Sequence, residues 1–306
     1  MFKLPGMPSY LASPHELADY AEWVCWQSKG TSKTALLQNL GRLDENDYTG
    51  GVPEEEETPD AVAEAFIEIE RRSIACRDGY PFTLGNEGYS LFPSGKGPND
   101  KQFIYRFLLL ATRLDMAKNK RHAGVDGTSL FEKLAAETGQ AYFGARSEKM
   151  IFGTSEKGSE FSAKVDLLCE KMQEGEGFVN RNEAPPKKRD GGLDVVVWKP
   201  FADNLPGKLI GFGQCKTGTH YRNTLTYLQP GTFCDNWLHS SPTVPPIRMF
   251  FVAEALPRYD WNSTAREAGL LFDRCRIVDY IEDLSNDTIE MAKAWTDAAY
   301  NYLVDA

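Results

Sequence analysis

The sequence contains no hydrophobic run long enough to cross a membrane. A membrane-spanning helix needs about 18 to 20 consecutive apolar residues, and no stretch of the 306 residues approaches that length. The first residues, MFKLPGMPSYL, also lack a long hydrophobic region followed by a small-residue cleavage site. We therefore expect a cytoplasmic protein without membrane association, and its hydrophobic content of 42% is sufficient for a core.

The six cysteines lack the spacing of a disulfide framework or a zinc site. No CxxC pair occurs, and no cysteine lies near a histidine at a zinc-finger distance. We expect reduced thiols, because a nucleophilic cysteine would need a histidine partner that the sequence does not place. Neither "SKGTSKT" (28–34) nor "SGKG" (94–97) has the GxxxxGK[ST] spacing, which excludes nucleotide hydrolysis of the P-loop type.

Negative charge is concentrated in the first third of the chain. The formal charge is −10; residues 1–100 hold 8 Lys and Arg against 17 Asp and Glu, or −9, and the rest holds 26 against 27, or −1. An acidic region repels a phosphate backbone. Two basic clusters lie in the nearly neutral remainder, at 118–122 and 185–190, and each is either a solvated loop or a phosphate contact. The second cluster contains Lys187, Lys188 and Arg189.

Residues 1–100 are predicted to form a mainly helical region. Ser13 and Glu16 have the spacing of an N-cap and a capping-box acid, and Thr58 marks the start of a second helix. Residues 79–100 are rich in Gly, Pro, Asn and Ser, which indicates loops or short strands and a boundary near residue 100. We expect this acidic region to serve in docking or in regulation, apart from a domain over 101–306.

After residue 100, helical and strand patterns alternate, which predicts an α/β fold. Helices are expected at 102–117, 128–141, 159–172 and 224–238 and from about 286, and strands at 141–153, 193–201, 209–218, 248–256 and 274–281. A Pro-Gly turn between 193–201 and 209–218 indicates a hairpin-like pair.

A small polar group is predicted at the ends of these two neighbouring strands. Residues two apart on a strand face the same side, so Gln214 and Lys216 point together while Cys215 points away. If the two strands pair, Asp194 lies beside them. A buried Asp or Lys without a partner costs several kcal/mol. We therefore expect Asp194, Gln214 and Lys216 to lie near one another or near a ligand.

These residue types suit phosphodiester hydrolysis. Mg²⁺ prefers oxygen ligands, here the Asp194 carboxylate, the Gln214 side-chain oxygen and the backbone carbonyl of Cys215. A divalent cation polarises a phosphate and lowers the pKa of a water. Lys216 is expected to orient the attacking water and to stabilise charge in the transition state.

The stretches "DGGLD" (190–194) and "GQCK" (213–216) resemble the PD-(D/E)xK nuclease superfamily, and within it the Mrr-like branch. The resemblance implies a restriction-endonuclease-like core, α-β-β-β-α-β, with a mixed sheet flanked by helices. It also implies that Asp194 binds Mg²⁺ or Mn²⁺ and that Gln214 and Lys216 complete the catalytic site.

A catalytic glutamate on the first core helix is also implied by this resemblance. "LFEKLAAETGQAYFG" resembles that helix, which makes Glu132 the implied catalytic acid and metal ligand. The choice stays open, because helical periodicity places Glu137 nearer the apolar face. A helix-like segment at 159–174, before the motif strand, also departs from the family pattern.

Three residues after the motif are candidates for contact with nucleic acid. His220 could contact a phosphate, Tyr221 could stack on a base and Arg222 could donate to a phosphate; for each of them a solvated loop is the alternative.

The resemblance implies a Mg²⁺-dependent endonuclease that acts on duplex DNA in bacterial restriction or antiviral defence, with a possible homo-oligomeric state. One alternative is a non-catalytic nucleic-acid-binding or assembly subunit that works with a helicase or ATPase partner, and the net acidity favours it. Another is an RNA-processing nuclease, which the sequence does not separate because such a site acts on the phosphate.

Overall fold

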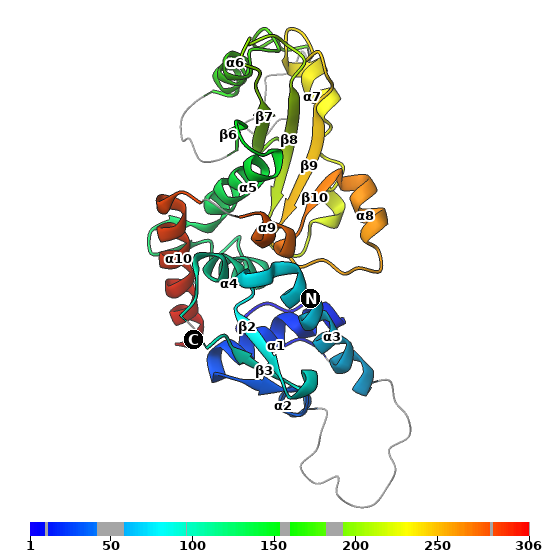
Figure 1. The fold of residues 1–306 in the computed structure, drawn as a ribbon, viewed down its shortest axis with the longest axis vertical. Coiled ribbons are helices and arrows are strands. Elements are labelled where there is room, and N and C mark those ends of the chain that lie inside the picture. Colours follow the sequence, from blue (N-terminus) through cyan, green and yellow to red (C-terminus); the bar gives the residue numbers. More distant parts are fainter. Residues whose placement is uncertain are drawn as a thin grey trace, which may run out of the picture.

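A mixed five-stranded sheet, with strand order β10-β9-β8-β7-β6, lies in the upper half of the molecule in Figure 1. The computed structural model describes residues 1–9, 12–41, 58–95, 97–153, 160–181, 192–281 and 284–305. The strands are β6 (Glu148–Ile151), β7 (Val195–Lys199), β8 (Leu209–Lys216), β9 (Ile247–Val252) and β10 (Leu270–Phe272). β6, β7 and β8 pair antiparallel, whereas β8, β9 and β10 pair parallel. The predicted α/β class and the β7–β8 pair are therefore confirmed.

Helices cover both faces of this sheet. They are α5 (Gly127–Phe143), α6 (Phe161–Met172) and α7 (Pro230–Trp237). Val195 and Val197 of β7 belong to the hydrophobic cluster that contains Leu134 of α5. Val196 and Trp198 belong to the cluster formed with α6 and α7. Successive residues of β7 point to opposite faces, and because both faces are buried the strand is an unbroken apolar run.

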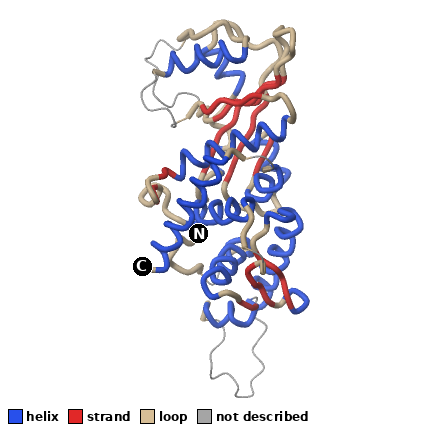
Figure 2. Tube along the Cα trace, turned by 60° about the vertical axis from the view of Figure 1, so that its left-hand side comes forward, coloured by secondary structure: helices blue, strands red, loops and turns tan. Residues whose placement is uncertain are grey.

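Residues 1–100 form helices and a small antiparallel sheet of order β1-β3-β2, which helices separate from the larger sheet (Figure 2). The elements are α1 (Pro14–Ser28), β1 (Thr31–Ser32), α2 (Lys33–Asn39), α3 (Thr58–Cys76), β2 (Phe82–Gly85) and β3 (Ser90–Pro93). Ser13 is the N-cap residue of α1, as predicted, but its side chain makes no capping hydrogen bond, and Glu16 accepts from the N–H of Phe2 instead of forming a capping box. The remaining elements are α4 (Asp100–Arg113), β4 (Arg121–His122), β5 (Val125–Asp126), α8 (Trp261–Ala268), α9 (Arg274–Tyr280) and α10 (Asn286–Val304).

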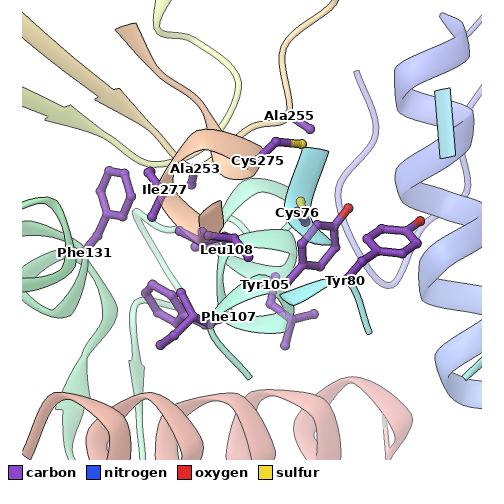
Figure 3. Close-up of a cluster of buried hydrophobic side chains, with 14 of the residues drawn as sticks. Cys76, Tyr80, Tyr105, Phe107, Leu108, Phe131, Ala253, Ala255, Cys275 and Ile277 are labelled. Atoms are coloured by element: carbon purple, nitrogen blue, oxygen red, sulfur yellow. The ribbon is translucent and has the colours of Figure 1, made fainter. Parts of the chain in front are cut away.

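One hydrophobic core joins the N-terminal region to the sheet. Cys76 at the end of α3, Tyr105 and Leu108 of α4, and Cys275 and Ile277 of α9 are buried in one cluster (Figure 3). That cluster extends from residue 2 to residue 303 and includes inner-face residues of β7 and β9. The acidic first third therefore shares its core with the rest of the chain.

The segment 274–281 is helical, and the expectation of a strand there is wrong. The side chain of Asp273 accepts a hydrogen bond from the backbone N–H of Arg276, which caps the first turn of α9. An N-cap of this kind satisfies a backbone donor that a helix end otherwise leaves unpaired. The nearby strand, β10, ends just before the cap.

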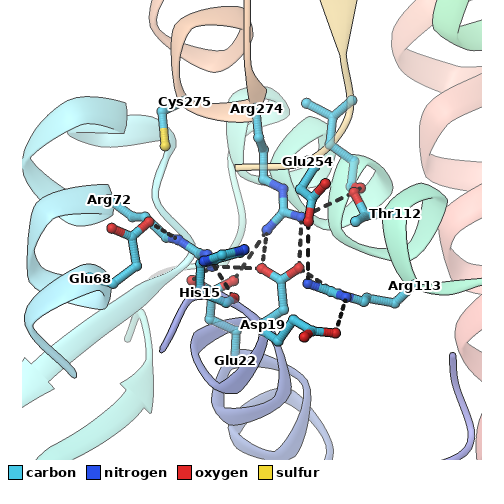
Figure 4. Close-up of polar contacts among 12 residues, drawn as sticks. His15, Asp19, Glu22, Glu68, Arg72, Thr112, Arg113, Glu254, Arg274 and Cys275 are labelled. Atoms are coloured by element: carbon cyan, nitrogen blue, oxygen red, sulfur yellow. Dashed lines mark hydrogen bonds and ion pairs between the residues drawn. The ribbon is translucent and has the colours of Figure 1, made fainter. Parts of the chain in front are cut away.

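Six ionic side chains are buried where the N-terminal helices meet the sheet (Figure 4). They are Glu16, Asp19 and Glu22 of α1, Arg72 of α3, Arg113 of α4 and Arg274 of α9. Asp19 lies at the centre: Oδ1 accepts from Arg72 at 2.7 Å and from Arg274 at 2.8 Å, and Oδ2 accepts from Arg113 at 2.7 Å. Burial alone would raise the pKa of the Asp19 carboxyl, but the three arginines hold it well below its ordinary value.

The buried ionic network extends to the strand ends. Arg274 Nε donates to the carbonyl of Ala253 at 3.1 Å, and the Ala253 N–H donates to the carbonyl of Lys216, the last residue of β8, at 3.2 Å. Glu254 comes next and lies 3.7 Å from Arg113, whose guanidinium also serves two acids of α1. Burial raises the pKa of Glu254 to about 7, against the opposing charge of Arg113. Three acids of the N-terminal region are thus internal counter-charges and are not displayed to a partner.

Candidate active site

The start of β7 and the end of β8 bring Asp194 beside the Gln-Cys-Lys stretch. The Asp194 N–H donates to the Gly213 carbonyl at 2.9 Å, and the Cys215 N–H donates to Asp194 Oδ2 at 2.7 Å. The N–H and C=O of one strand residue point to the same side, so the Cys215 carbonyl also faces the side on which Asp194 lies. The predicted proximity of Asp194 to this stretch is confirmed.

Gln214 is buried, and its side-chain oxygen has no hydrogen-bond partner among the residues that the structure describes. The residue is 2% exposed, and within the described ranges no donor reaches its Oε1 atom. A Cβ at Gly192, where φ is 64°, would lie 3.2 Å from Gln214 Nε2, so the glycine lets the loop before β7 approach the amide closely. A buried acceptor without a donor costs about 1 to 3 kcal/mol. This atom is therefore suited to a ligand that binds oxygen.

Lys216 ends β8 with a partly buried side chain. Its backbone carbonyl accepts a hydrogen bond from the Ala253 N–H. Among the described residues, no carboxylate forms an ion pair with its ammonium group. The ammonium group is near enough to Cys215 for its charge to act on that thiol. Lys216 therefore supplies a positive charge at the same strand end as Asp194.

The surroundings of the Cys215 thiol disfavour its thiolate form. Burial raises its pKa well above the ordinary value, and the negative charges of Asp194 and Glu132 raise it further. The thiol packs against the core on the α5 side of the sheet. Of the two carboxylates, Asp194 contacts Cys215 directly, because its Oδ2 accepts the hydrogen bond from the Cys215 N–H.

Of the two candidate glutamates on α5, Glu132 is the one at this site. Its carboxylate lies against Gly153, where a Cβ would come within 2.7 Å of Oε2. Glu137 instead accepts hydrogen bonds from Ser285 and Thr288, each at 3.1 Å, at the N-terminus of α10. The structure thus brings Glu132 to the strand ends and uses Glu137 to hold a neighbouring helix.

Gly153 and Lys164 also belong to the site, although the sequence did not single them out. The N–H groups of Phe152 and Gly153 donate to the Asp194 carbonyl at 2.7 and 2.9 Å. Lys164 of α6 donates to the carbonyls of the same two residues at 3.1 and 2.7 Å. The signal available in the sequence was a glycine at the end of a predicted strand, which often marks a close approach of another backbone or ligand.

The candidates for nucleic-acid contact have different surroundings. His220 is exposed, and Arg222 is exposed but pairs with Asp260 at 2.5 Å. Tyr221 is only 3% exposed and packs against Phe250. This burial corrects the expectation of a stacking ring, since no face of the ring is open to a base. Lys187, Lys188 and Arg189 lie outside the described residues.

The donor set fits a hard divalent cation. Asp194 and Glu132 are carboxylates near one strand end, Gln214 offers a buried oxygen without a donor, and Cys215 offers a carbonyl. All four candidate donors are oxygen atoms, which Mg²⁺ and Mn²⁺ prefer. Within the described ranges no three His, Cys, Asp or Glu side chains converge in the manner of a metal cluster. A cation here would thus depend on an amide and a carbonyl as well as on two acids.

Comparisons with protein-family models, curated proteins and solved structures gave no match. In the part of the chain that the structure describes, no helix has both the length and the apolar character needed to cross a bilayer. The residues at the ends of β7 and β8 are therefore the features of this chain that bear on its function.

Proposed function

We propose that the chain is a metal-dependent nuclease of the PD-(D/E)xK type that cleaves DNA. The observation that carries the proposal is the buried Gln214 Oε1, which has no donor among the described residues and lies on the strand whose Cys215 N–H binds Asp194. A structural glutamine would ordinarily have its oxygen satisfied. An oxygen-binding ligand at this position would satisfy the Gln214 oxygen.

The order of elements supports the assignment. α5, β6, β7, β8, α7 and β9 follow one another as α-β-β-β-α-β, with the first three strands antiparallel and the fourth parallel to the third. This is the order that the resemblance implies for a restriction-endonuclease-like core. α6 is an insertion between β6 and β7. The departure noted in the sequence is thus an added helix, which packs with α7 on one face of the sheet.

The residues would divide the work as follows. Asp194, Glu132, Gln214 and the Cys215 carbonyl would hold Mg²⁺ or Mn²⁺, which when bound supplies a Lewis acid for the phosphate and a more acidic water. Lys216 holds the attacking water and donates to a phosphate oxygen as negative charge develops. Because Asp194 Oδ2 is already fixed by the Cys215 N–H at 2.7 Å, its carboxylate is oriented before any ligand arrives.

Duplex DNA is the proposed substrate, and the acidity of the chain bears on how it is reached. The formal charge of −10 provides few cations to displace counterions from a duplex, so a DNA-translocating ATPase or self-association would raise the local concentration. The six cysteines are unpaired, as is usual in a reducing compartment. A cytoplasmic role in restriction or antiviral defence is consistent with both features.

Incubating the purified chain with supercoiled plasmid and with RNA tests the proposal. We expect cleavage of the plasmid in Mg²⁺ or Mn²⁺ and none in EDTA. Cleavage of RNA alone would move the assignment to RNA processing. No cleavage of either substrate, with the isolated chain or with added ATPase fractions, would favour a non-catalytic assembly subunit.

A further inference from the structure

Residues 152 and 153, which follow β6, are fixed by several contacts next to the proposed metal site. Their N–H groups donate to the Asp194 carbonyl at 2.7 and 2.9 Å. The Phe152 ring is buried and meets the Phe161 ring of α6 edge to face, with 5.8 Å between centroids. Lys164 Nζ donates to both carbonyls, at 3.1 Å for Phe152 and 2.7 Å for Gly153. The segment is thus bound to β7 through one set of backbone atoms and to α6 through the other.

The same segment limits how close Glu132 comes to Asp194. The Glu132 carboxylate lies directly over Gly153, and even a methyl group there would come within 2.7 Å of Oε2. Gly153 therefore contacts both the Glu132 carboxylate and the backbone of Asp194. Any movement of this segment changes the spacing of the two acids, because it contacts both of them.

We propose that Lys164 is a positioning residue that sets the spacing between Glu132 and Asp194 by holding residues 152 and 153 in place. This inference rests on the proposed function, since the spacing matters only if the two acids share a cation. It makes the inserted helix α6 part of the site. Lys164 itself does not touch the metal or the substrate in this role.

The position of Lys164 on α6 is well suited to this role. Phe161 and Lys164 are three residues apart, and residues at this spacing are neighbours on one face of a helix. The next turn of α6 is anchored in the sheet, because Val165 and Leu168 are buried against β7 and β8. An ammonium group has three donors, and two of them are used by the backbone of this segment.

Charge and position predict opposite effects when Lys164 is neutralised. If the lysine acted only through its positive charge, Lys164→Met would remove repulsion and tighten the binding of a cation. If it positions the acids, the same change loosens residues 152 and 153 and weakens binding. The sign of the change in metal affinity therefore separates the two roles.

The test measures Mn²⁺ binding without substrate, through the electron paramagnetic resonance signal of the free ion. We expect Lys164→Met to bind Mn²⁺ about tenfold more weakly or worse, as is typical when a residue that supports metal ligands is lost. Lys164→Arg keeps a donor for the two carbonyls and should recover most of the affinity. Lys171→Met, the same substitution at an exposed position of α6, should leave binding unchanged.

A second measurement is independent of the metal. In Lys164→Met, hydrogen exchange in peptides covering residues 150–153 should accelerate relative to both the parent and Lys171→Met, since the amides bonded to Asp194 lose their support. Gly153→Ala offers a separate route, because it displaces Glu132 while retaining Lys164. It should weaken Mn²⁺ binding too, which keeps the inference testable if Lys164→Met fails to fold.

Unchanged or tighter Mn²⁺ binding by folded Lys164→Met would overturn the positioning role while leaving the proposed nuclease intact. A parent protein that neither binds Mn²⁺ nor cleaves DNA would refute the proposed function, and this role with it. The parent is measured first, so the two failures are distinguished.

Discussion

Replacing Asp19 by asparagine should destabilise the fold far more than the same substitution at an exposed aspartate. Asp19 is buried among three arginines, with hydrogen bonds of 2.7, 2.7 and 2.8 Å. Asp19→Asn keeps the shape of the side chain, but it leaves three buried guanidinium groups with two carboxylates of α1. The amide also turns a donor towards cations that need an acceptor.

The expected magnitude follows from this geometry. Removing one partner of a buried ion pair costs about 3 to 5 kcal/mol, because the remaining charge stays buried without compensation. Single domains are stable by only about 5 to 15 kcal/mol. Asp19→Asn should therefore remove a large part of the free energy of unfolding. The loss should affect the whole fold, since the network joins four helices and reaches β8 through Ala253.

Urea unfolding at pH 7, followed by circular dichroism, measures this change. Asp287→Asn is the matched control, since Asp287 pairs with Lys133 at 2.9 Å but is 72% exposed. Such a surface pair contributes about 0 to 1 kcal/mol. If Asp19→Asn lost no more stability than Asp287→Asn, the arginines would have other counter-charges and the reasoning would be wrong.

Three further predictions concern single side chains. The folded-state pKa of Glu254, about 7, lies above the unfolded value, so its contribution to stability is full below about pH 4.5 and is lost as the pH rises to 7. The parent should therefore lose about 3 kcal/mol of stability over this range. Glu254→Gln should lack this loss, so its melting temperature should fall less between pH 5 and pH 8 than that of the parent, and an equal fall would contradict the prediction. Glu132→Gln should greatly slow plasmid cleavage. Glu137→Gln should cleave at the parental rate but melt at a lower temperature, because the Glu137 side chain holds the start of α10. Equal cleavage by both variants would exclude Glu132 from the site. The parent should need about millimolar Mg²⁺ for cleavage, since Gln214 offers a neutral oxygen. Gln214→Glu should lower the Mg²⁺ concentration for half-maximal cleavage. Saturation of the parent at low micromolar Mg²⁺ would refute this.

The pairing at the candidate site was predictable from the sequence because it is local. A Pro-Gly turn separates two apolar runs, and antiparallel pairing across a short connection places the start of one strand beside the end of the next. Asp194 and the Gln-Cys-Lys stretch met for this reason. The opposite directions of the Gln214 and Cys215 side chains follow from strand alternation alone.

Contacts between distant elements were not predictable in the same way. Helical periodicity favoured Glu137 because α5 packs against two partners, the sheet and α10, and an averaged apolar face does not separate them. Glu132 reaches the site only because Gly153, on another element, leaves room for it. The Lys164 side chain bonds to the backbone carbonyls of Phe152 and Gly153. Every residue has such a carbonyl, so the sequence does not show which ones a lysine binds.

The acids of α1 show the same limit. Glu16, Asp19 and Glu22 recur every three residues and so share one helical face. The sequence predicts a capping role for Glu16 and, from net charge alone, an acidic region that repels a phosphate backbone. Their burial depends on arginines of α3, α4 and α9, which periodicity within α1 does not reveal.

The central claim, that Asp194 and Lys216 cleave DNA with a divalent cation, is tested most directly by plasmid cleavage with two matched pairs of variants. Asp194→Asn is compared with Asp287→Asn, and Lys216→Met with Lys171→Met, after circular dichroism has confirmed that each is folded. We predict metal-dependent cleavage by the parent and both controls. In the two site variants the cleavage rate should fall by about 100-fold or more, as it does when a group that stabilises the transition state is lost. Cleavage at the parental rate by either site variant, or cleavage that persists in EDTA, would contradict the claim.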